Sequence, residues 1–182
     1  MENRERESQY IVYLCPVGEL NRQIEVYFAR SCDSFGANKA HQYMPHCTLT
    51  GFFSDFDSSV TDYLNALEQS VKEAKLPLNV TIKRLIFGQT WHGIELQADS
   101  VKQLVANFAQ IEDSPSRKEP LRLKDWLHLS LAYGFNLQHG EELEQLARRT
   151  IELESEVHWE LRFYRKNPDW TWYCFKSWSI SG

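Results

Sequence analysis

Two short segments of the chain carry the same set of side chains able to exchange protons and donate hydrogen bonds. Each has a histidine, one apolar residue, a hydroxyl residue and leucine: His46-Cys47-Thr48-Leu49 and His128-Leu129-Ser130-Leu131. Side chains alternate between the two faces of a strand, so the histidine and the hydroxyl residue of an extended segment share a face. With six histidines in the chain, two such matches would arise by chance in about one sequence in a hundred. The pair therefore indicates a site.

These side chains suit the cleavage of a phosphoester. Histidine is the side chain most readily found in either protonation state near neutral pH. One imidazole can take a proton from attacking water while the other gives one to the departing oxygen, and each transfer is worth about 10²–10⁴-fold in rate. The hydroxyls can donate to the phosphoryl oxygens, where charge must be stabilised. The candidate catalytic set, which needs no metal or other cofactor, is His46, Thr48, His128 and Ser130, and which histidine is the base stays open.

Other chemistries explain the same residues less well. A serine hydrolase of the nucleophile-elbow type would need a G-x-S-x-G turn, which the sequence lacks. A zinc site on the two motif histidines has no evident third ligand, although His41 or His92 could be proposed. Either motif taken alone also fits a half-exposed strand with a polar face. The four cysteines form no C-x-x-C pair, so we expect them to stay reduced.

The periodicity of apolar residues predicts the elements that position the motifs. Alternating or β-rich runs predict about seven strands, over residues 9–15, 46–53, 78–87, 91–96, 128–133, 157–164 and 172–180. Helical spacing predicts four amphipathic helices between them, over residues 20–28, 60–71, 101–108 and 143–151. Turn signals at residues 87–93 and 167–169 predict hairpins. Side-chain caps are expected from Asp57 or Ser58 for the second helix and from Asp99 or Ser100 for the third.

The order β-α-β-α-β-β-α-β-α-β-β is nearly one pattern stated twice, with one histidine-bearing strand in each half. Helices packed on one face of antiparallel strands make an α+β fold. Residues 112–119 are the one clear loop-like tract, and their polarity predicts a mobile connection within a single domain, residues 1–182.

Composition and charge narrow the substrate and the location. Hydrophobic residues make up 42% and charged residues 25%, as in folded globular domains. The net charge of −5 argues against a surface for long nucleic acid, so a small cyclic nucleotide fits better. No run of 18 apolar residues occurs and residues 1–9 are charged, so we expect a cytoplasmic location without membrane association. The oligomeric state is not indicated.

The paired motifs, in a chain of this length, resemble the two-histidine (2H) phosphoesterase superfamily over essentially the whole sequence. The resemblance implies a bilobal fold of two pseudo-symmetric antiparallel sheets with flanking helices, whose motifs face each other across a central cleft. Residues 128–133 are similar to the second motif of plant-type cyclic phosphodiesterases, in which a tyrosine five positions after the histidine contacts substrate; here that tyrosine is Tyr133. Strand parity alone would place Tyr133 on the opposite face from His128, so this role requires a bend or strand end.

Residues 13–18 and 43–53 also resemble the phosphodiesterase-like domain of the suppressor of T-cell receptor signalling (TULA) proteins. The ubiquitin-associated, SH3 and histidine-phosphatase-like modules of those proteins have no counterpart in these 182 residues, so no signalling partner is implied. The expected reaction is hydrolysis of a nucleoside 2′,3′-cyclic phosphate, to the 2′-phosphate by resemblance to the plant-type enzymes. The alternatives are an enzyme that processes RNA ends and a non-catalytic module that binds a phosphorylated ligand or a partner protein.

A few aromatic and basic residues are further candidates. Tyr43 precedes the first motif and Trp91 precedes a strand, so either could stack on a nucleobase. Three tryptophans fall in the last predicted hairpin, where cross-strand packing is the ordinary explanation: Trp170, Trp172 and Trp178. Three cations could attract a phosphate, although solvated surface charge is the commoner role: Lys83, Arg122 and Lys124.

Overall fold

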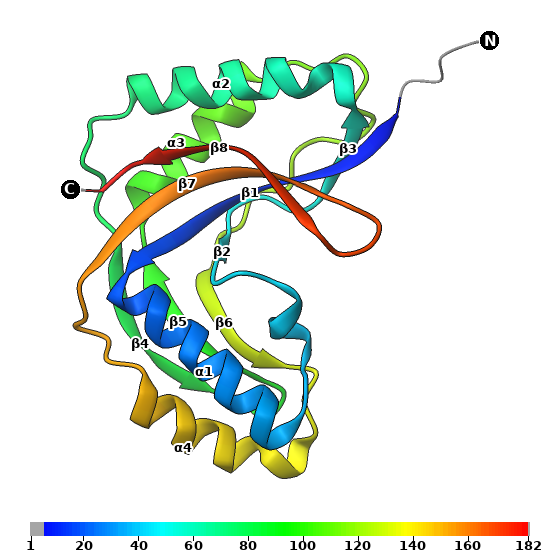
Figure 1. The fold of residues 1–182 in the computed structure, drawn as a ribbon. Helices are drawn as coiled ribbons and strands as arrows, with labels where there is room; N and C mark the ends of the chain where they lie inside the picture. Colours follow the sequence, from blue (N-terminus) through cyan, green and yellow to red (C-terminus); the bar gives the residue numbers. More distant parts are fainter. Residues whose placement is uncertain (1–5, 182) are drawn as a thin grey trace.

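The computed structural model describes residues 6–181 and contains an antiparallel sheet with four α-helices and three short 3-10 helices in that span (Figure 1). The strands are β1 (Glu7–Gly18), β2 (Cys47–Thr48), β3 (Phe53–Phe56), β4 (Thr81–Phe87), β5 (Trp91–Gln97), β6 (Leu127–Tyr133), β7 (Val157–Lys166) and β8 (Trp172–Ser179). The α-helices are α1 (Glu19–Phe35), α2 (Val60–Glu73), α3 (Asp99–Ile111) and α4 (Gly140–Thr150). The 3-10 helices are η1 (Lys39–Gln42), η2 (Asp57–Ser59) and η3 (Leu137–His139).

The strand order is β4-β5-β6-β2-β1-β7-β8, with β3 also paired to β1. The predicted α+β class and antiparallel pairing are therefore confirmed. The two expected half-sheets are hydrogen-bonded into one sheet, because the short β2 pairs with β1 on one side and β6 on the other. Both predicted hairpins, β4–β5 and β7–β8, are present.

The predicted strand over residues 46–53 is broken into β2 and β3. Both strands pair antiparallel with β1, but their registers differ by two residues, since Thr48 lies opposite Tyr13 and Phe53 lies opposite Tyr10. The intervening backbone bulges away, and the side-chain hydroxyl of Thr50 accepts the hydrogen bond of the Val12 N–H at 3.1 Å. Side-chain capping of an unpaired strand N–H makes this break possible without a buried orphan donor.

The two faces of β1 serve different purposes. Tyr10, Val12 and Leu14 are fully buried and pack in one core with the apolar stripes of all four α-helices. Ile11 and Tyr13 face the other side of the sheet, where a second, smaller cluster forms. In Figure 1, α2 lies with α3 at one end of the sheet and α1 with α4 at the other. The helices thus leave one sheet face free for a site.

The predicted helix caps are wrong. The N-cap residues are Ser59 for α2 and Ala98 for α3, and neither makes a side-chain capping bond. Asp57 lies in η2 and accepts a hydrogen bond from the hydroxyl of Tyr10 at 2.5 Å. Ser100 instead donates to a backbone carbonyl 21 residues away. Tertiary partners outcompete the local N–H groups for these side chains.

Residues 112–119 are anchored, which corrects the expectation of a mobile connection. The hydroxyls of Ser114 and Ser116 each donate to the Asp55 carboxylate at 2.6 Å, and Tyr63 donates to it at the same distance. A buried carboxylate must be satisfied in this way, so the polar side chains of the loop turn inward.

Two other expectations concern the chain as a whole. The four cysteine thiols are free. Within residues 6–181, the structure has no helix with the length and apolar character required to traverse a bilayer.

Candidate active site

The two histidine motifs lie on neighbouring strands of the sheet. β2 and β6 pair antiparallel, with Cys47 directly opposite Leu129. One residue further in each direction, this register sets the histidine of each motif opposite the hydroxyl residue of the other: His46 opposite Ser130, and His128 opposite Thr48. Because side chains alternate, all four face the same side, and the two histidines become diagonal neighbours, whose Cα atoms lie about 7–8 Å apart in an antiparallel pair. Side chains at such diagonal positions are within reach of a shared ligand.

A pocket of about 250 Å³ opens on this face of the sheet. It is lined by Ile11, Tyr13, Tyr43, His46, Thr48, Gly51, Phe52, Arg122, Lys124, Ser130 and Tyr133. This lining combines three predicted catalytic residues, four aromatic rings and two cations, and it contains no carboxylate among the residues described. The fourth catalytic candidate, His128, does not line the pocket, although its charge is close enough to lower the pKa of His46.

The His46 ring is held between two tyrosines. Its centroid lies 4.1 Å from that of Tyr13 and 5.2 Å from that of Tyr43. Its Nδ1 lies 2.8 Å from the carbonyl of Met44, and a carbonyl only accepts, so Nδ1 carries the proton and Nε2 is the free nitrogen. Burial lowers the pKa of His46 to about 4, with His128 adding to the shift and the Met44 bond opposing it. A neutral His46 at pH 7 can therefore accept a proton through Nε2.

His128 is packed between two tryptophans. Its ring centroid lies 4.2 Å from Trp126 and 5.0 Å from Trp91, the latter edge-on. Burial lowers the pKa of His128, the charge of Lys124 lowers it further, and the backbone of Trp126 opposes the shift. The buried Nδ1 nonetheless makes no hydrogen bond of normal geometry. Each motif histidine is thus held by aromatic rings at its own side of the β2–β6 pair.

The Ser130 hydroxyl is oriented by Trp91. The indole N–H donates to Ser130 Oγ at 3.0 Å, which occupies an acceptor lone pair and leaves the hydroxyl proton for a ligand. The indole can lie there because Gly93 has no side chain; a Cβ would come within 2.2 Å of indole Cζ2. Trp91 does not line the pocket, so its position supports a part in holding Ser130 and His128 more than the predicted base stacking.

The pocket position of Tyr133 depends on a bulge in β6. The β5–β6 register shifts so that His92 lies opposite Ala132 while Gly93 lies opposite Ser130, which leaves Leu131 as an extra residue. Leu131 and Ala132 are both fully buried, and Tyr133 turns back to the pocket face. There its hydroxyl interacts with that of Tyr43. The bend that a substrate-binding role required is present, and Tyr43 and Tyr133 form one wall.

Two of the three predicted cations reach the pocket. The backbone of residues 122–124 pairs with that of residues 49–51, since the Gly51 N–H bonds to the Arg122 carbonyl at 2.7 Å and the Lys124 N–H to the Leu49 carbonyl at 3.0 Å. This pairing carries Arg122 and Lys124 to the lining, where both side chains remain exposed. That they attract a phosphate stays a prediction. Lys83 lies exposed on β4 and outside the lining.

The sequence interpretation missed three aromatic residues of the site. Tyr13 lies opposite Thr48 on β1 and so shares its face. Trp126 precedes His128 by two residues, and strand parity could have placed it beside the imidazole. Phe52 lines the pocket and stacks with Trp172 at 6.1 Å.

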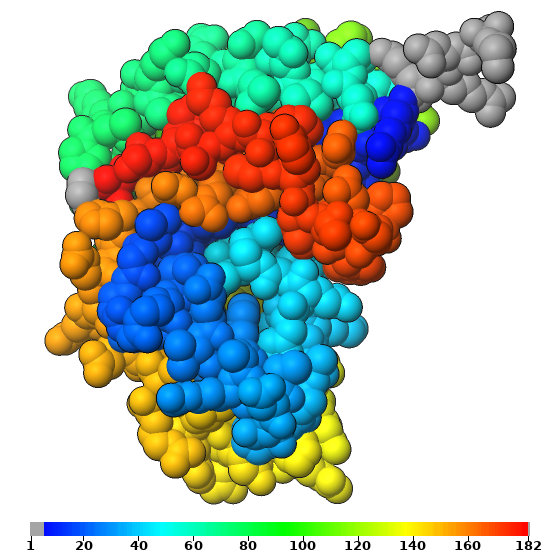
Figure 2. All heavy atoms as spheres, in the orientation of Figure 1, coloured from blue at the N-terminus to red at the C-terminus, as the bar shows by residue number. Residues whose placement is uncertain are grey.

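The last hairpin contributes to the same aromatic group. Trp178 is buried, as its structural interpretation predicts, and Trp172 donates from its indole to the Gln42 carbonyl at 3.1 Å. Trp170 is 44% exposed and meets the Tyr43 ring edge-on. Figure 2 shows the orange-red turn of the β7–β8 hairpin resting on the cyan segment that carries η1 and β2. The hairpin thereby covers the outer side of Tyr43.

The proposed extra metal ligands lie elsewhere. His41 bonds to Ser31 Oγ and to the Asn38 N–H, both at 3.0 Å, and His92 packs against two phenylalanines. Over residues 6–181, no three His, Cys, Asp or Glu side chains gather as a metal site would need. Metal-independent chemistry stays a prediction that a chelator can test.

Comparison with known proteins gives relatives that share this region. No protein-family model matches the sequence. The chain is 29% identical to Ubiquitin-associated and SH3 domain-containing protein B of Mus musculus over 163 residues, covering 87% of the chain and 25% of that protein. It is 29% identical to Ecdysteroid-phosphate phosphatase of Bombyx mori over 165 residues, 88% of the chain and 25% of that protein. Identity to Ubiquitin-associated and SH3 domain-containing protein A of Mus musculus is 27% over 175 residues, 88% of the chain and 26% of that protein.

The chain thus spans about a quarter of the length of the curated relatives it matches. The ubiquitin-associated and SH3 domain-containing relatives are the TULA proteins, so the resemblance read from the motifs is confirmed.

Proposed function

We propose that this chain hydrolyses the cyclic phosphodiester of a nucleotide, with nucleoside 2′,3′-cyclic phosphates as the substrate class. The observation that carries the proposal is the antiparallel apposition of the two motifs, Cys47 opposite Leu129, at a pocket lined by two cations and by no carboxylate of the residues described. Unpaired cations in a carboxylate-free pocket favour an anionic ligand.

The reaction follows from the chemistry of the four motif residues. One imidazole takes a proton from water as the water oxygen attacks phosphorus, and the bond between phosphorus and the 3′ oxygen breaks. The other imidazole, in its protonated form, gives its proton to that leaving oxygen. Thr48 and Ser130 donate to the non-bridging oxygens, where charge grows in the transition state. The product is a nucleoside 2′-phosphate, in keeping with the resemblance to plant-type cyclic phosphodiesterases.

The electrostatics of the free pocket are matched to this scheme. Burial lowers the pKa of both histidines, which favours the base form of each. A bound phosphodiester brings a negative charge that stabilises one imidazolium, so the substrate itself supports the protonated partner. Arg122 and Lys124 supply further positive charge for binding.

The named activity of one relative agrees with the class of bond. Ecdysteroid-phosphate phosphatase, by its name, acts on a phosphate ester. The chain corresponds to about a quarter of that protein, so the proposal here rests on the pocket and takes from the relative only the phosphoester class.

The test is turnover of 2′,3′-cyclic AMP, GMP, CMP and UMP by the purified chain with EDTA present. We expect hydrolysis unaffected by the chelator, with 2′-phosphate products separable from 3′-phosphates by ion-exchange chromatography. His46→Ala and His128→Ala should lose several orders of magnitude. Binding of these nucleotides without turnover would favour a non-catalytic phospho-ligand module, and activity lost in EDTA and restored by a metal would refute the metal-independent scheme.

A further inference from the structure

A carboxylate lies directly across the sheet from one of the motif histidines. Glu95 on β5 is the cross-strand partner of His128 on β6, and Arg84 on β4 is in turn the partner of Glu95. Directly opposed residues share a face, with Cβ atoms about 4.5–5.5 Å apart. The neighbours of Glu95 on its own strand, Ile94 and Leu96, are buried in the main core. Glu95 therefore points to the sheet face that carries the motifs.

Both oxygens of the Glu95 carboxylate have partners. The guanidinium of Arg84 donates to Oε2 at 2.9 Å, and the indole N–H of Trp126 donates to Oε1 at 3.3 Å. Among the described residues, Lys124 is the charged side chain that shifts the pKa of His128, and Glu95 is not. Glu95 thus acts on His128 through the indole that it holds and not through its charge.

Trp126 depends on side-chain contacts for its position. β6 begins at Leu127, and the pair of Leu127 with Leu96 is the last of the β5–β6 ladder in that direction. Trp126 lies beyond this pair, is 48% exposed, and meets the ring of Trp91 at a centroid distance of 5.1 Å. A half-exposed side chain changes rotamer readily, so the hydrogen bond to Glu95 favours the observed orientation of the indole.

Trp126 in turn holds the imidazole of His128. The two ring centroids lie 4.2 Å apart at an interplanar angle of 34°. The Trp126 backbone raises the pKa of His128, as a carbonyl that accepts from the ring does, yet Nδ1 makes no bond of normal geometry to the residues described. In the first motif the corresponding bond, from His46 Nδ1 to the Met44 carbonyl, is 2.8 Å long. The orientation of His128 therefore depends more on packing against Trp126.

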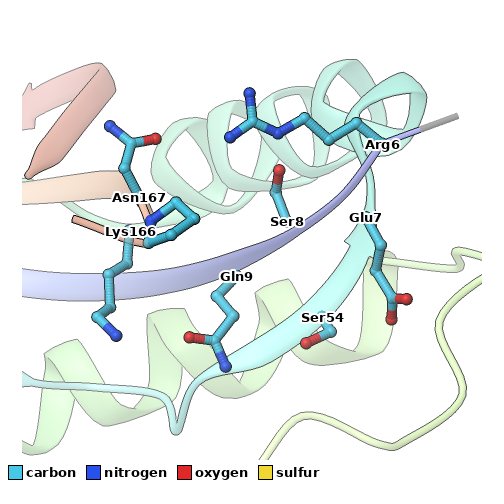
Figure 3. A pocket seen from close by; sticks show the side chains of 8 residues that line it. Arg6, Glu7, Ser8, Gln9, Ser54, Lys166 and Asn167 are labelled. Atoms are coloured by element: carbon cyan, nitrogen blue, oxygen red, sulfur yellow. The ribbon is translucent and has the colours of Figure 1, made fainter. Parts of the chain in front are cut away.

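The cavity at the outer end of β1 shows no such convergence of the described side chains. It measures about 490 Å³, and Figure 3 shows Gln9 and Lys166 extending to one side of the β1 ribbon. Arg6, Ser8 and Asn167 extend to the other side (Figure 3). These groups do not meet at one ligand, in contrast to the side chains that pack around the second motif histidine.

We propose that Glu95 is a positioning residue for the reaction: its carboxylate fixes the Trp126 indole, which holds the His128 imidazole in the orientation that proton transfer requires. This deepens the proposed function and rests on it. The pocket lining includes neither Glu95 nor Trp126, so their effect falls on proton transfer more than on the affinity for substrate. The ion pair with Arg84 also neutralises a carboxylate that would otherwise repel a phosphodiester.

The test measures kcat and KM on a 2′,3′-cyclic nucleotide for four variants. Glu95→Ala and Trp126→Phe remove the hydrogen bond, and each should lower kcat about tenfold or more while KM stays within about threefold. Glu95→Gln keeps an acceptor for the indole and loses the charge, so its kcat should stay within about threefold of the wild type. Glu68→Ala is the matched control, because Glu68 accepts from the Trp178 indole at 2.8 Å and pairs with Lys176 at the other end of the sheet. Its kcat should stay within about twofold of the wild type.

The His128 imidazole gives a readout that does not depend on turnover. In NMR spectra of the chain labelled with ¹⁵N at histidine, neutral His128 should carry its proton on Nδ1 in the wild type and in Glu95→Gln. Glu95→Ala should change the tautomer populations of His128 and leave those of His46 unchanged.

Three results would overturn the positioning role while the proposed function stood. They are a kcat within twofold of the wild type in Glu95→Ala, an equal loss of kcat in Glu95→Gln and Glu95→Ala, and an equal loss in Glu68→Ala. If the wild type turns over no cyclic nucleotide, the proposed function fails, and the NMR spectra still decide on Glu95. A change of tautomer confined to His128 in Glu95→Ala then supports the positioning role, and unchanged His128 signals refute it.

Discussion

Replacing Gly93 with alanine should disable the site without touching any motif residue. Gly93 lies on β5 opposite Ser130. An added Cβ would stand 2.2 Å from Cζ2 of the Trp91 indole and 2.4 Å from the Leu129 carbonyl oxygen. Carbon atoms in contact are about 3.5–4.0 Å apart, so the indole or the β6 backbone must move by more than about 1 Å. Neither movement is free, because both groups position the motifs.

The size of the effect follows from what those two groups hold. The indole donates to Ser130 Oγ at 3.0 Å and packs against His128 at 5.0 Å. Leu129 is the residue that pairs with Cys47 across the β2–β6 junction. A displacement of about 1 Å at a catalytic group costs roughly 100-fold in rate, and overpacking a core costs about 1–3 kcal/mol of stability. We expect both losses in Gly93→Ala.

The assay pairs urea denaturation with kcat/KM on a 2′,3′-cyclic nucleotide. Gly140→Ala is the matched control, since Gly140 is helical and its added Cβ would meet only Phe135, at 3.7 Å. That substitution should be neutral or stabilising by up to about 1 kcal/mol. The account of how Trp91 positions Ser130 is wrong if Gly93→Ala unfolds at the same urea concentration as the wild type and keeps kcat/KM within twofold of it.

Three further predictions follow from the site and the core. Because burial lowers the pKa of both His46 and His128, kcat/KM should rise as pH falls below 7 and peak under about pH 6.5. The optimum of kcat should lie at a higher pH, since bound phosphate stabilises an imidazolium. A kcat/KM optimum above pH 7.5 would contradict the lowered pKa values. Arg122→Ala should raise KM for a cyclic nucleotide about tenfold, while the control Lys83→Ala should change KM less than twofold. Equal effects of the two substitutions would show that Arg122 takes no part in substrate binding. Burial raises the pKa of Asp55, but the hydrogen bonds to its carboxylate outweigh this effect and hold the pKa below the usual value. Asp55→Ala should therefore lower the free energy of unfolding by about 2–4 kcal/mol at pH 7. This difference in stability from the wild type should narrow as pH falls through the lowered pKa, and a difference that stays constant down to pH 2 would refute the assignment.

Periodicity was sufficient to predict most of the elements. The apolar stripes of the four helices all lie in the main core, and the alternation in β1 divides core residues such as Val12 from pocket residues such as Tyr13. What periodicity could not predict is where a polar side chain finds its partner. Asp57 accepts a hydrogen bond from Tyr10 instead of capping α2. Asp55 accepts a hydrogen bond from Ser114, in a loop 59 residues further along the chain.

The same division holds for the site. The alternation of side chains along a strand predicts that each histidine shares a face with the hydroxyl residue of its own motif, because that relation depends only on neighbouring residues. The apposition of Cys47 and Leu129 depends on strand order, which no local pattern contains. The place of Tyr133 depends on one extra residue in β6, at Leu131, and a bulge of this kind leaves little trace in hydrophobic alternation.

The most direct measurement of the central claim is kcat/KM on a 2′,3′-cyclic nucleotide for His46→Ala, His128→Ala and the double variant. If the two imidazoles transfer protons in one coupled step, each single substitution should lower kcat/KM about 10²–10⁴-fold. The kcat/KM of the double variant should then be little lower than that of either single variant. Residual activity within tenfold of wild type in either single variant, or losses that multiply in the double variant, would show that the histidines do not act together on one phosphorus atom.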